Sequence, residues 1–254
     1  MSIKTNHSDH QLGREHFHCL WDKEIPPTLF VEPGEVAEIE TWEASGGKIS
    51  KDSTTNDISK LNNDTANPVT GPIFVNGAEP GDLLEIEIID FALSNWGRTA
   101  IIPGFGLLSE DFSDPYLLIS LHDQKNVELF PNVIVPTVPF PGTIGLAPNT
   151  TAPQAMIPPM SFCGRSCGGN MDIPELTRGS KLYLPVEVAG ALFSVGDTHA
   201  AQGSGEVCGT AIESPMKLQV RFDLQKSKDF YAPWAELPAP KMNNEILSIG
   251  SIMT

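Results

Sequence analysis

A run of acidic residues and one histidine, spaced by small residues, lies near the end of the chain. The segment GDTHAAQGSGEVCGTAIE occupies residues 196–213 and carries Asp197, His199, Gln202, Glu206 and Glu213. In an extended chain, residues two apart point to the same side, so Asp197 and His199 present a carboxylate and an imidazole together. Such a pair can bind one metal ion. The segment contains no Lys or Arg, and crowded carboxylates are costly unless a cation lies among them. We therefore interpret it as the wall of a metal site.

The same spacing also has a purely structural interpretation. An isolated Asp197 can cap a turn, and His199 can be a buried histidine whose hydrogen bonds are satisfied. Gly203 and Gly205 point toward a site, because glycine lets the backbone approach a ligand closely. From this segment alone, the two interpretations stay about equally open.

A second polar stretch, CGGNMDIPEL, spans residues 167–176. Asn170 and Asp172 again share one side of an extended chain. Taken alone, the stretch predicts a glycine turn followed by an Asx-type cap before a short helix.

The elements that must position these residues are predicted by composition. The chain has 254 residues with 22 Gly, 22 Pro and 40 % hydrophobic residues. Proline breaks helices and is confined to the ends, edges and bulges of sheets. We expect a mainly β chain of antiparallel sheets, sandwich- or barrel-like, with few short helices. SKLNN, DIPEL and the region near Trp234 are the expected helical segments.

One turn-and-strand unit occurs twice in the first half. EPGEVAEIET begins at Glu32 and EPGDLLEIEI at Glu79. In each, Pro-Gly predicts a turn, and the alternation that follows predicts a half-buried antiparallel strand. We expect paired hairpins within an N-terminal β region, residues 1–150. A C-terminal β region, residues 151–254, carries both polar stretches, and the two regions form one compact unit.

The charge balance excludes some partners. The sequence has 32 acidic and 16 basic residues, a net charge of −16. This charge repels nucleic acid and anionic membrane surfaces, and it favours metal cations and neutral substrates. The N-terminus lacks the apolar region of a signal peptide, and no apolar run reaches a membrane span. We expect a cytoplasmic protein whose four cysteines are reduced, although Cys163 and Cys167 form a weak candidate for a structural metal pair.

Several long, ordered blocks resemble the acetamidase/formamidase family, and they cover most of the chain. They are NPVTGPIFVNGAEPGDLLEIEI from Asn67, PGFG from Pro103, IGLAP from Ile144, GGNMD from Gly168 and LYLPVEVAGALFSVGDTHAAQGSGEVCGTAIE from Leu182. The resemblance implies hydrolysis of short amides such as formamide or acetamide to ammonia and a carboxylate. It also implies a largely β structure, association into a homodimer or larger, and a bound divalent metal, with zinc favoured and calcium as the alternative. The chain departs from the family pattern at Ser204, where an Asp is common, and at Cys167, where a His is common, which puts the substrate in doubt.

Amide hydrolysis needs an activated water and an electrophile for the carbonyl, and residue type and spacing suggest the roles. We assign His199, Asp197 and Asp172 to the metal. Glu206 is the expected general base, and Glu213 an alternative base or a further ligand. For the oxyanion and the substrate we expect Asn170, Gln202 and the backbone at Gly168 and Gly169.

Three rival interpretations remain open. Cys208 or Cys167 could be the nucleophile of a cysteine-dependent amide or carbamate hydrolase, if a neighbouring base lowered the pKa of its thiol. Ser204 is a weaker nucleophile candidate, because Gly-Ser-Gly lacks a strand-to-helix elbow. The chain could also be a non-catalytic β protein that holds a metal or a sugar.

Overall fold

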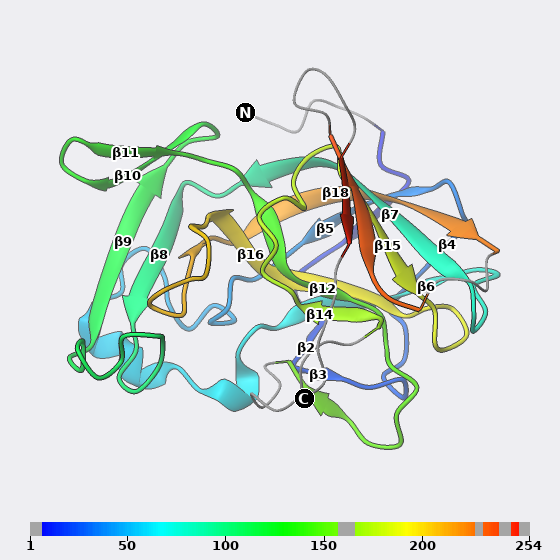
Figure 1. Ribbon diagram of the computed structural model, residues 1–254, viewed down its shortest axis with the longest axis horizontal. Helices are drawn as coiled ribbons and strands as arrows, with labels where there is room; N and C mark the ends of the chain where they lie inside the picture. Colours follow the sequence, from blue (N-terminus) through cyan, green and yellow to red (C-terminus); the bar gives the residue numbers. More distant parts are fainter. Residues whose placement is uncertain (1–6, 157–165, 227–230, 239–244, 249–254) are drawn as a thin grey trace.

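A computed structural model describes residues 7–156, 166–226, 231–238 and 245–248. Strands account for 44 % and helices for 4 % of the structure, which confirms the expected mainly β chain. Two large sheets pack face to face, and the larger one extends beyond the smaller toward β8–β11 on the left of Figure 1. In the described residues, only β1 with β5 and β4 with β6 pair parallel, so the sheets are largely antiparallel.

The smaller sheet has seven strands. In spatial order they are β1 (His10–Leu12), β5 (Val36–Glu40), β18 (Met216–Gln225), β7 (Leu83–Leu93), β15 (Lys181–Pro185), β19 (Trp234–Leu237) and β20 (Glu245–Ser248).

The larger sheet has eleven strands and carries the polar stretches of the sequence. Its main path is β11 (Val133–Pro136), β10 (Asn126–Phe130), β9 (Tyr116–His122), β8 (Trp96–Ile101), β17 (Ile212–Glu213), β16 (Phe193–Ala201), β12 (Phe140–Gly145) and β14 (Gly168–Asn170). On one side, β6 (Val69–Val75) pairs with β16, β2 (Phe17–His18) and β4 (Leu29–Val31). A separate pair joins β3 (Leu20–Trp21) to β13 (Gln154–Ala155), and two 3₁₀ helices are η1 (Thr55–Lys60) and η2 (Asn63–Thr65).

The main hydrophobic core fills the space between the two sheets. The alternation predicted for the second repeat holds, because Leu84, Ile86 and Ile88 of β7 are fully buried. Across the sandwich, the rings of Phe193 on β16 and Phe222 on β18 meet edge to face, with centroids 5.0 Å apart. Such pairs add to the free energy gained by burying their area, so β16 is held firmly against the smaller sheet.

The two Pro-Gly turns form as predicted, but they are not hairpins. Gly34 and Gly81 have φ of +93° and +97°, which the turns require and glycine adopts without strain. Each turn carries the chain from the larger sheet to the smaller one, from β4 to β5 and from β6 to β7. The repeated strands then both pair with β18 of the C-terminal region. A turn fixes the local direction of the chain and leaves the choice of strand partner to packing, which explains the difference.

Two of the three expected helical segments also differ. Trp234 lies on strand β19, where its ring stacks on that of Tyr183 at 3.9 Å between centroids. The DIPEL segment forms a single turn closed by the Leu176 amide donating to the Ile173 carbonyl. Near SKLNN, the chain forms η1 and η2. In the described part of the chain, no helix has the length and apolar character to span a membrane.

Candidate active site

The site lies where strand β16 changes its neighbour. Gly196 pairs with Val69 of β6, whereas three residues later His199 pairs with Glu213 of β17. A Cβ on Gly196 would lie 2.1 Å from the Pro68 carbonyl oxygen, so only glycine fits this close approach. The next residue, Asp197, has φ of +49°, a left-handed conformation that is uncommon without glycine. The residues from Asp197 to Ala201 thus belong to strand β16, which is bent at the site, and the strand ends after Ala201.

A cavity of about 270 Å³ opens beside this bend. Its lining combines several acids and one histidine with two cations, Lys48 and Arg98. The acids and the histidine are Asp172, Asp197, His199, Glu206 and Glu213. The structure therefore brings together all five sequence-predicted metal ligands and bases.

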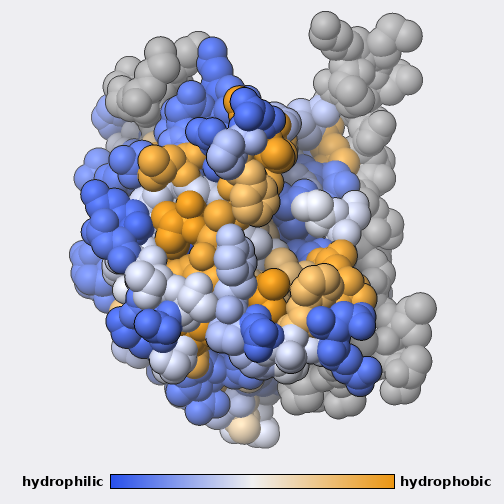
Figure 2. All heavy atoms as spheres, turned by 90° about the vertical axis from the view of Figure 1, so that its left-hand side faces the viewer, coloured by the Kyte–Doolittle hydropathy of each residue, from blue (hydrophilic) through white to orange (hydrophobic). Residues whose placement is uncertain are grey.

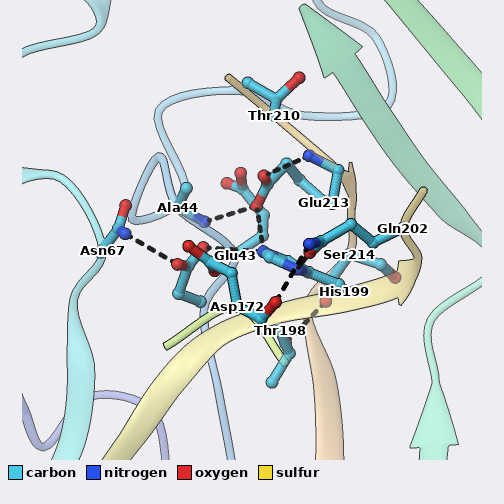
Figure 3. Close-up of polar contacts among 12 residues, drawn as sticks. Glu43, Ala44, Asn67, Asp172, Thr198, His199, Gln202, Thr210, Glu213 and Ser214 are labelled. Carbon is cyan, nitrogen blue, oxygen red and sulfur yellow. Dashed lines mark hydrogen bonds and ion pairs between the residues drawn. The ribbon is translucent and has the colours of Figure 1, made fainter. Parts of the chain in front are cut away.

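His199 is at the centre of this cluster. Its Nε2 lies 3.4 Å from Oδ1 of Asp197 and 3.6 Å from Oε2 of Glu213, and all three side chains are at most 3 % exposed. Figure 3 shows His199 beside Glu213, with Asp172, two residues after the end of β14, close by. Two sets of side chains offer donor atoms within 4.8 Å of one another: Asp172, Asp197 and His199, and His199, Glu206 and Glu213.

Gln202 fixes the tautomer of His199. The Nε2 of Gln202 donates to the Asp172 carbonyl oxygen at 3.2 Å, so its Oε1 is the atom that faces His199 Nδ1 at 2.9 Å. His199 Nδ1 must then be the donor. In the neutral imidazole, the lone pair is left on Nε2, aimed at the carboxylates.

Several polar atoms of the cluster lack hydrogen-bond partners in the described structure. They are Oδ1 of Asp197, Nε2 of His199 and Oε1 of Glu206, and all are buried. Buried polar atoms without partners are rare and costly. Acceptors from an imidazole and carboxylates that converge in this way form a donor set that fits a divalent metal.

The pKa shifts of these side chains in the metal-free protein are also those expected of a metal site. Burial opposes a charged imidazolium, yet the charges of Glu213 and Asp197 raise the pKa of His199 to about 10. Burial and the charge of Asp197 raise the pKa of Asp172 to about 8. Burial raises the pKa of Glu213 to about 8 and also raises that of Glu206. Protons therefore occupy the cluster near neutral pH when no metal does.

A hydrogen-bonded frame holds two of the acids. Asn67 Nδ2 donates to Oδ2 of Asp197 and to Oδ1 of Asn170, both at 2.7 Å. Thr143 donates to the same Oδ1 at 2.7 Å, and Asn170 Nδ2 donates to Oδ2 of Asp172 at 2.8 Å. Asn170 thus orients Asp172. Sequence reasoning missed Asn67 and Thr143, which reach the site from distant segments.

The other predicted substrate-binding residues lie elsewhere. Gly168 and Gly169 pair with β12, and a Cβ on Gly168 would lie 2.6 Å from the Ile144 carbonyl oxygen. Neither glycine lines the cavity, and nor does Gln202, which contacts His199.

The candidate nucleophiles are not among the residues that line the cavity. Cys167 is buried in the main core, Cys208 donates to the Thr210 carbonyl oxygen at 3.4 Å, and Ser204 is exposed. Cys163, the other half of the candidate metal pair, lies outside the described residues.

A buried ion pair was not foreseen from the sequence. Arg98 of β8 donates from Nε to Oε2 of Glu43 at 2.8 Å, and the two side chains are 2 % and 1 % exposed. A lone arginine in a strand carries no signal that distinguishes it from a surface residue.

The chain is similar to known proteins over most of its length. The model of the Acetamidase/Formamidase family matches residues 3–158 and 159–245. An acetamidase of Mycolicibacterium smegmatis is 30 % identical over 82 % of this chain and 66 % of its own length. The aligned part spans about two thirds, 64–66 %, of the curated relatives that it matches.

Solved structures share the fold. The acetamidase of Bacillus halodurans superposes with a TM-score of 0.82 at 30 % identity, covering 89 % of this chain and 74 % of that one. A gamma lactamase from Delftia acidovorans superposes with a TM-score of 0.81 at 26 % identity, covering 95 % of this chain and 72 % of that one.

Proposed function

This chain belongs to the acetamidase/formamidase family, and from that premise we propose that it hydrolyses a short-chain amide. The products are a carboxylate and ammonia, and a divalent metal held at this site would activate the water. The observation that carries the proposal is the set of buried atoms on Asp197, His199 and Glu206 that make no hydrogen bond in the described structure and belong to residues lining one cavity.

Asp172, Asp197 and His199 would hold the metal. An imidazole with carboxylates suits zinc, whereas calcium takes six to eight oxygen ligands, so zinc is the favoured ion. When bound, such an ion lowers the pKa of a water ligand to about 7 and polarises a carbonyl.

Glu206 is the general base in this scheme. Its Oε1 has no hydrogen bond within the described residues, and burial raises the pKa of its carboxyl group, which makes the carboxylate a better proton acceptor. It takes the proton of the attacking water and delivers it to the leaving nitrogen. Glu213 is the alternative base or a fourth ligand, since its Oε2 lies 3.6 Å from His199 Nε2. Asn170 supports the site by orienting Asp172.

The acidic lining favours a neutral amide over an anionic one. Linear amides such as formamide and acetamide are the expected substrates, and the likeness to a lactamase adds small cyclic amides to those worth testing. The experiment is a screen for ammonia release and ring opening with metal-free protein, before and after zinc is restored. Activity with zinc, and its loss in His199→Ala together with the metal, supports the proposal. Activity of the metal-free protein equal to that of the zinc form contradicts it.

We propose that the protein is a homodimer or larger assembly. Figure 2 shows apolar side chains gathered on the face toward β9, β10 and β11. The register sets Phe130 of β10 opposite Val133 of β11, 49 % and 45 % exposed, and nearby Leu121 and Ile134 are 66 % and 63 % exposed. Contiguous exposed apolar surface is typical of interfaces. Sedimentation should give a species heavier than the 27.5 kDa chain, and Ile134→Glu should dissociate it; wild-type protein that sediments only as the single chain contradicts the proposal.

A further inference from the structure

Arg98 lies beside the acidic cluster and is held in place by the protein. Its Nε donates to Oε2 of Glu43, which also accepts from the Ser45 amide at 3.0 Å, and the Ser45 hydroxyl donates to Oε1 of Glu43. Glu43 is thus fully engaged, and the guanidinium is fixed against it. Arginine holds such planar, directed contacts better than lysine does.

One nitrogen of this guanidinium has no acceptor among the described residues. Nη1 of Arg98 is buried and makes no hydrogen bond within the described residues, although Arg98 lines the cavity. A buried cationic donor without an acceptor is costly. Because Arg98 lines the cavity and none of the described residues accepts from Nη1, a molecule bound in the cavity is the candidate acceptor.

The strand register shows where that acceptor must lie. Glu213 of β17 pairs with Arg98 of β8 on one side and with His199 of β16 on the other. The three residues form one row across adjacent strands. Neighbouring strands are spaced by roughly 4.8 Å, so a small molecule beside Glu213 lies within reach of both ends of the row.

We propose that Arg98 is a substrate- and product-binding residue whose Nη1 donates to an oxygen of the acyl group. In the amide this oxygen is the carbonyl, and in the product it is one of the carboxylate oxygens. Without such a donor, the carboxylate product would be repelled by the like charges of the four acids that line the cavity. A charge-assisted bond from arginine to a carboxylate is among the stronger hydrogen bonds. The identity of the ligand rests on the proposed function, whereas the unpaired donor does not.

The test is a titration of the zinc-loaded protein with sodium acetate, monitored by NMR. A titration with sodium chloride at equal ionic strength is the reference. Arg98→Lys keeps a cation for Glu43 but has no second nitrogen for the ligand. Acetate affinity should fall about tenfold or more in this variant, while zinc content stays unchanged. Lys48→Met is the matched control, because it removes the other cation of the cavity, whose Nζ already donates to Thr65. Acetate affinity should change less than about threefold there.

Activity gives a second readout. If Arg98 binds the acyl oxygen, Arg98→Lys raises KM for the amide and weakens competitive inhibition by acetate. If Arg98 only adjusts the charge of Glu213, the pH profile of kcat shifts and acetate affinity does not, which overturns the proposal. Should Arg98→Lys fail to fold, the pair Glu43→Gln with Arg98→Gln removes both buried charges and must lose acetate binding.

The two proposals fail separately. A wild-type protein that releases no ammonia from any amide but binds acetate through Arg98 contradicts only the proposed function. A wild-type protein that binds no acetate, or an Arg98→Lys variant that binds it as tightly as wild type, overturns the role of Arg98.

Discussion

His199 donates a hydrogen bond from Nδ1 to Oε1 of Gln202, three residues later in the chain, across 2.9 Å. In the deprotonated imidazole that a metal requires, this contact leaves the lone pair on Nε2, which lies 3.4 Å from Asp197 Oδ1 and 3.6 Å from Glu213 Oε2. Figure 3 shows His199 between Gln202 and Glu213. A partner that orients a histidine ligand in this way fixes its tautomer and ring position, and its loss typically lowers metal affinity.

Gln202→Leu should therefore weaken zinc binding by about 10- to 100-fold, because the imidazole loses its fixed tautomer. Gln202→Glu, which retains an acceptor for Nδ1–H, should keep zinc affinity close to that of wild type. Calorimetric titration with zinc measures both, and circular dichroism checks that the β fold is intact. Equal zinc affinity in the Leu variant and wild type would show that Gln202 has no such role.

Gly142→Ala should damage the site without changing any of its donors. A Cβ at this position would lie 2.7 Å from His199 Cε1 and 2.8 Å from Oδ1 of Asp172. The ring and the carboxylate must move apart, so we expect zinc affinity and ammonia release to fall at least about tenfold. Gly203→Ala is the control, because nothing lies within 4 Å of a Cβ there. If both variants behave alike, the close approach at Gly142 is unimportant.

Zinc affinity should rise with pH. In the metal-free protein, the pKa values of Asp172 and Glu213 are about 8 and that of His199 about 10, so these groups hold protons at pH 7. Metal ligands must be deprotonated, so binding releases protons, and the raised pKa values make zinc compete better as pH increases. Between pH 6 and 8 we expect roughly a tenfold gain per pH unit for each proton displaced.

Calorimetry in buffers of different ionisation enthalpy counts the protons released at pH 7. A dissociation constant for zinc that does not change between pH 6 and 8 is incompatible with this protonation scheme.

The β architecture was largely predictable, because the Pro and Gly load and the alternation at Leu84, Ile86 and Ile88 are local signals. The spacing of Asp197 and His199 also predicted their proximity. By contrast, Arg98 and Asn67 reach the site from strands and loops about a hundred residues away in sequence. A single sequence carries no signal for strand register, so their contacts with Glu213 and Asp197 could not be foreseen.

Cys208→Ala should retain ammonia release within about threefold of wild type. The thiol donates to the Thr210 carbonyl oxygen, and the residue does not line the cavity, so no step of hydrolysis depends on it. Cys167→Ala should lower the thermal midpoint of unfolding, because Cys167 is fully buried in the main core. The folded Cys167→Ala protein should retain zinc-dependent ammonia release. Loss of activity in folded, zinc-loaded Cys208→Ala would favour the cysteine mechanism instead.

The most direct measurement is ammonia release by Glu206→Gln at zinc occupancy equal to wild type. The substitution keeps the shape of the side chain and removes the carboxylate whose Oε1 lacks a hydrogen bond in the described structure. Glu110→Gln, at an exposed position away from the cavity lining, is the matched control. If a water is activated at this cavity with Glu206 as its base, kcat for acetamide or formamide falls by about 10²- to 10⁴-fold and the control is unaffected. A Glu206→Gln protein that retains zinc and wild-type kcat would contradict the account.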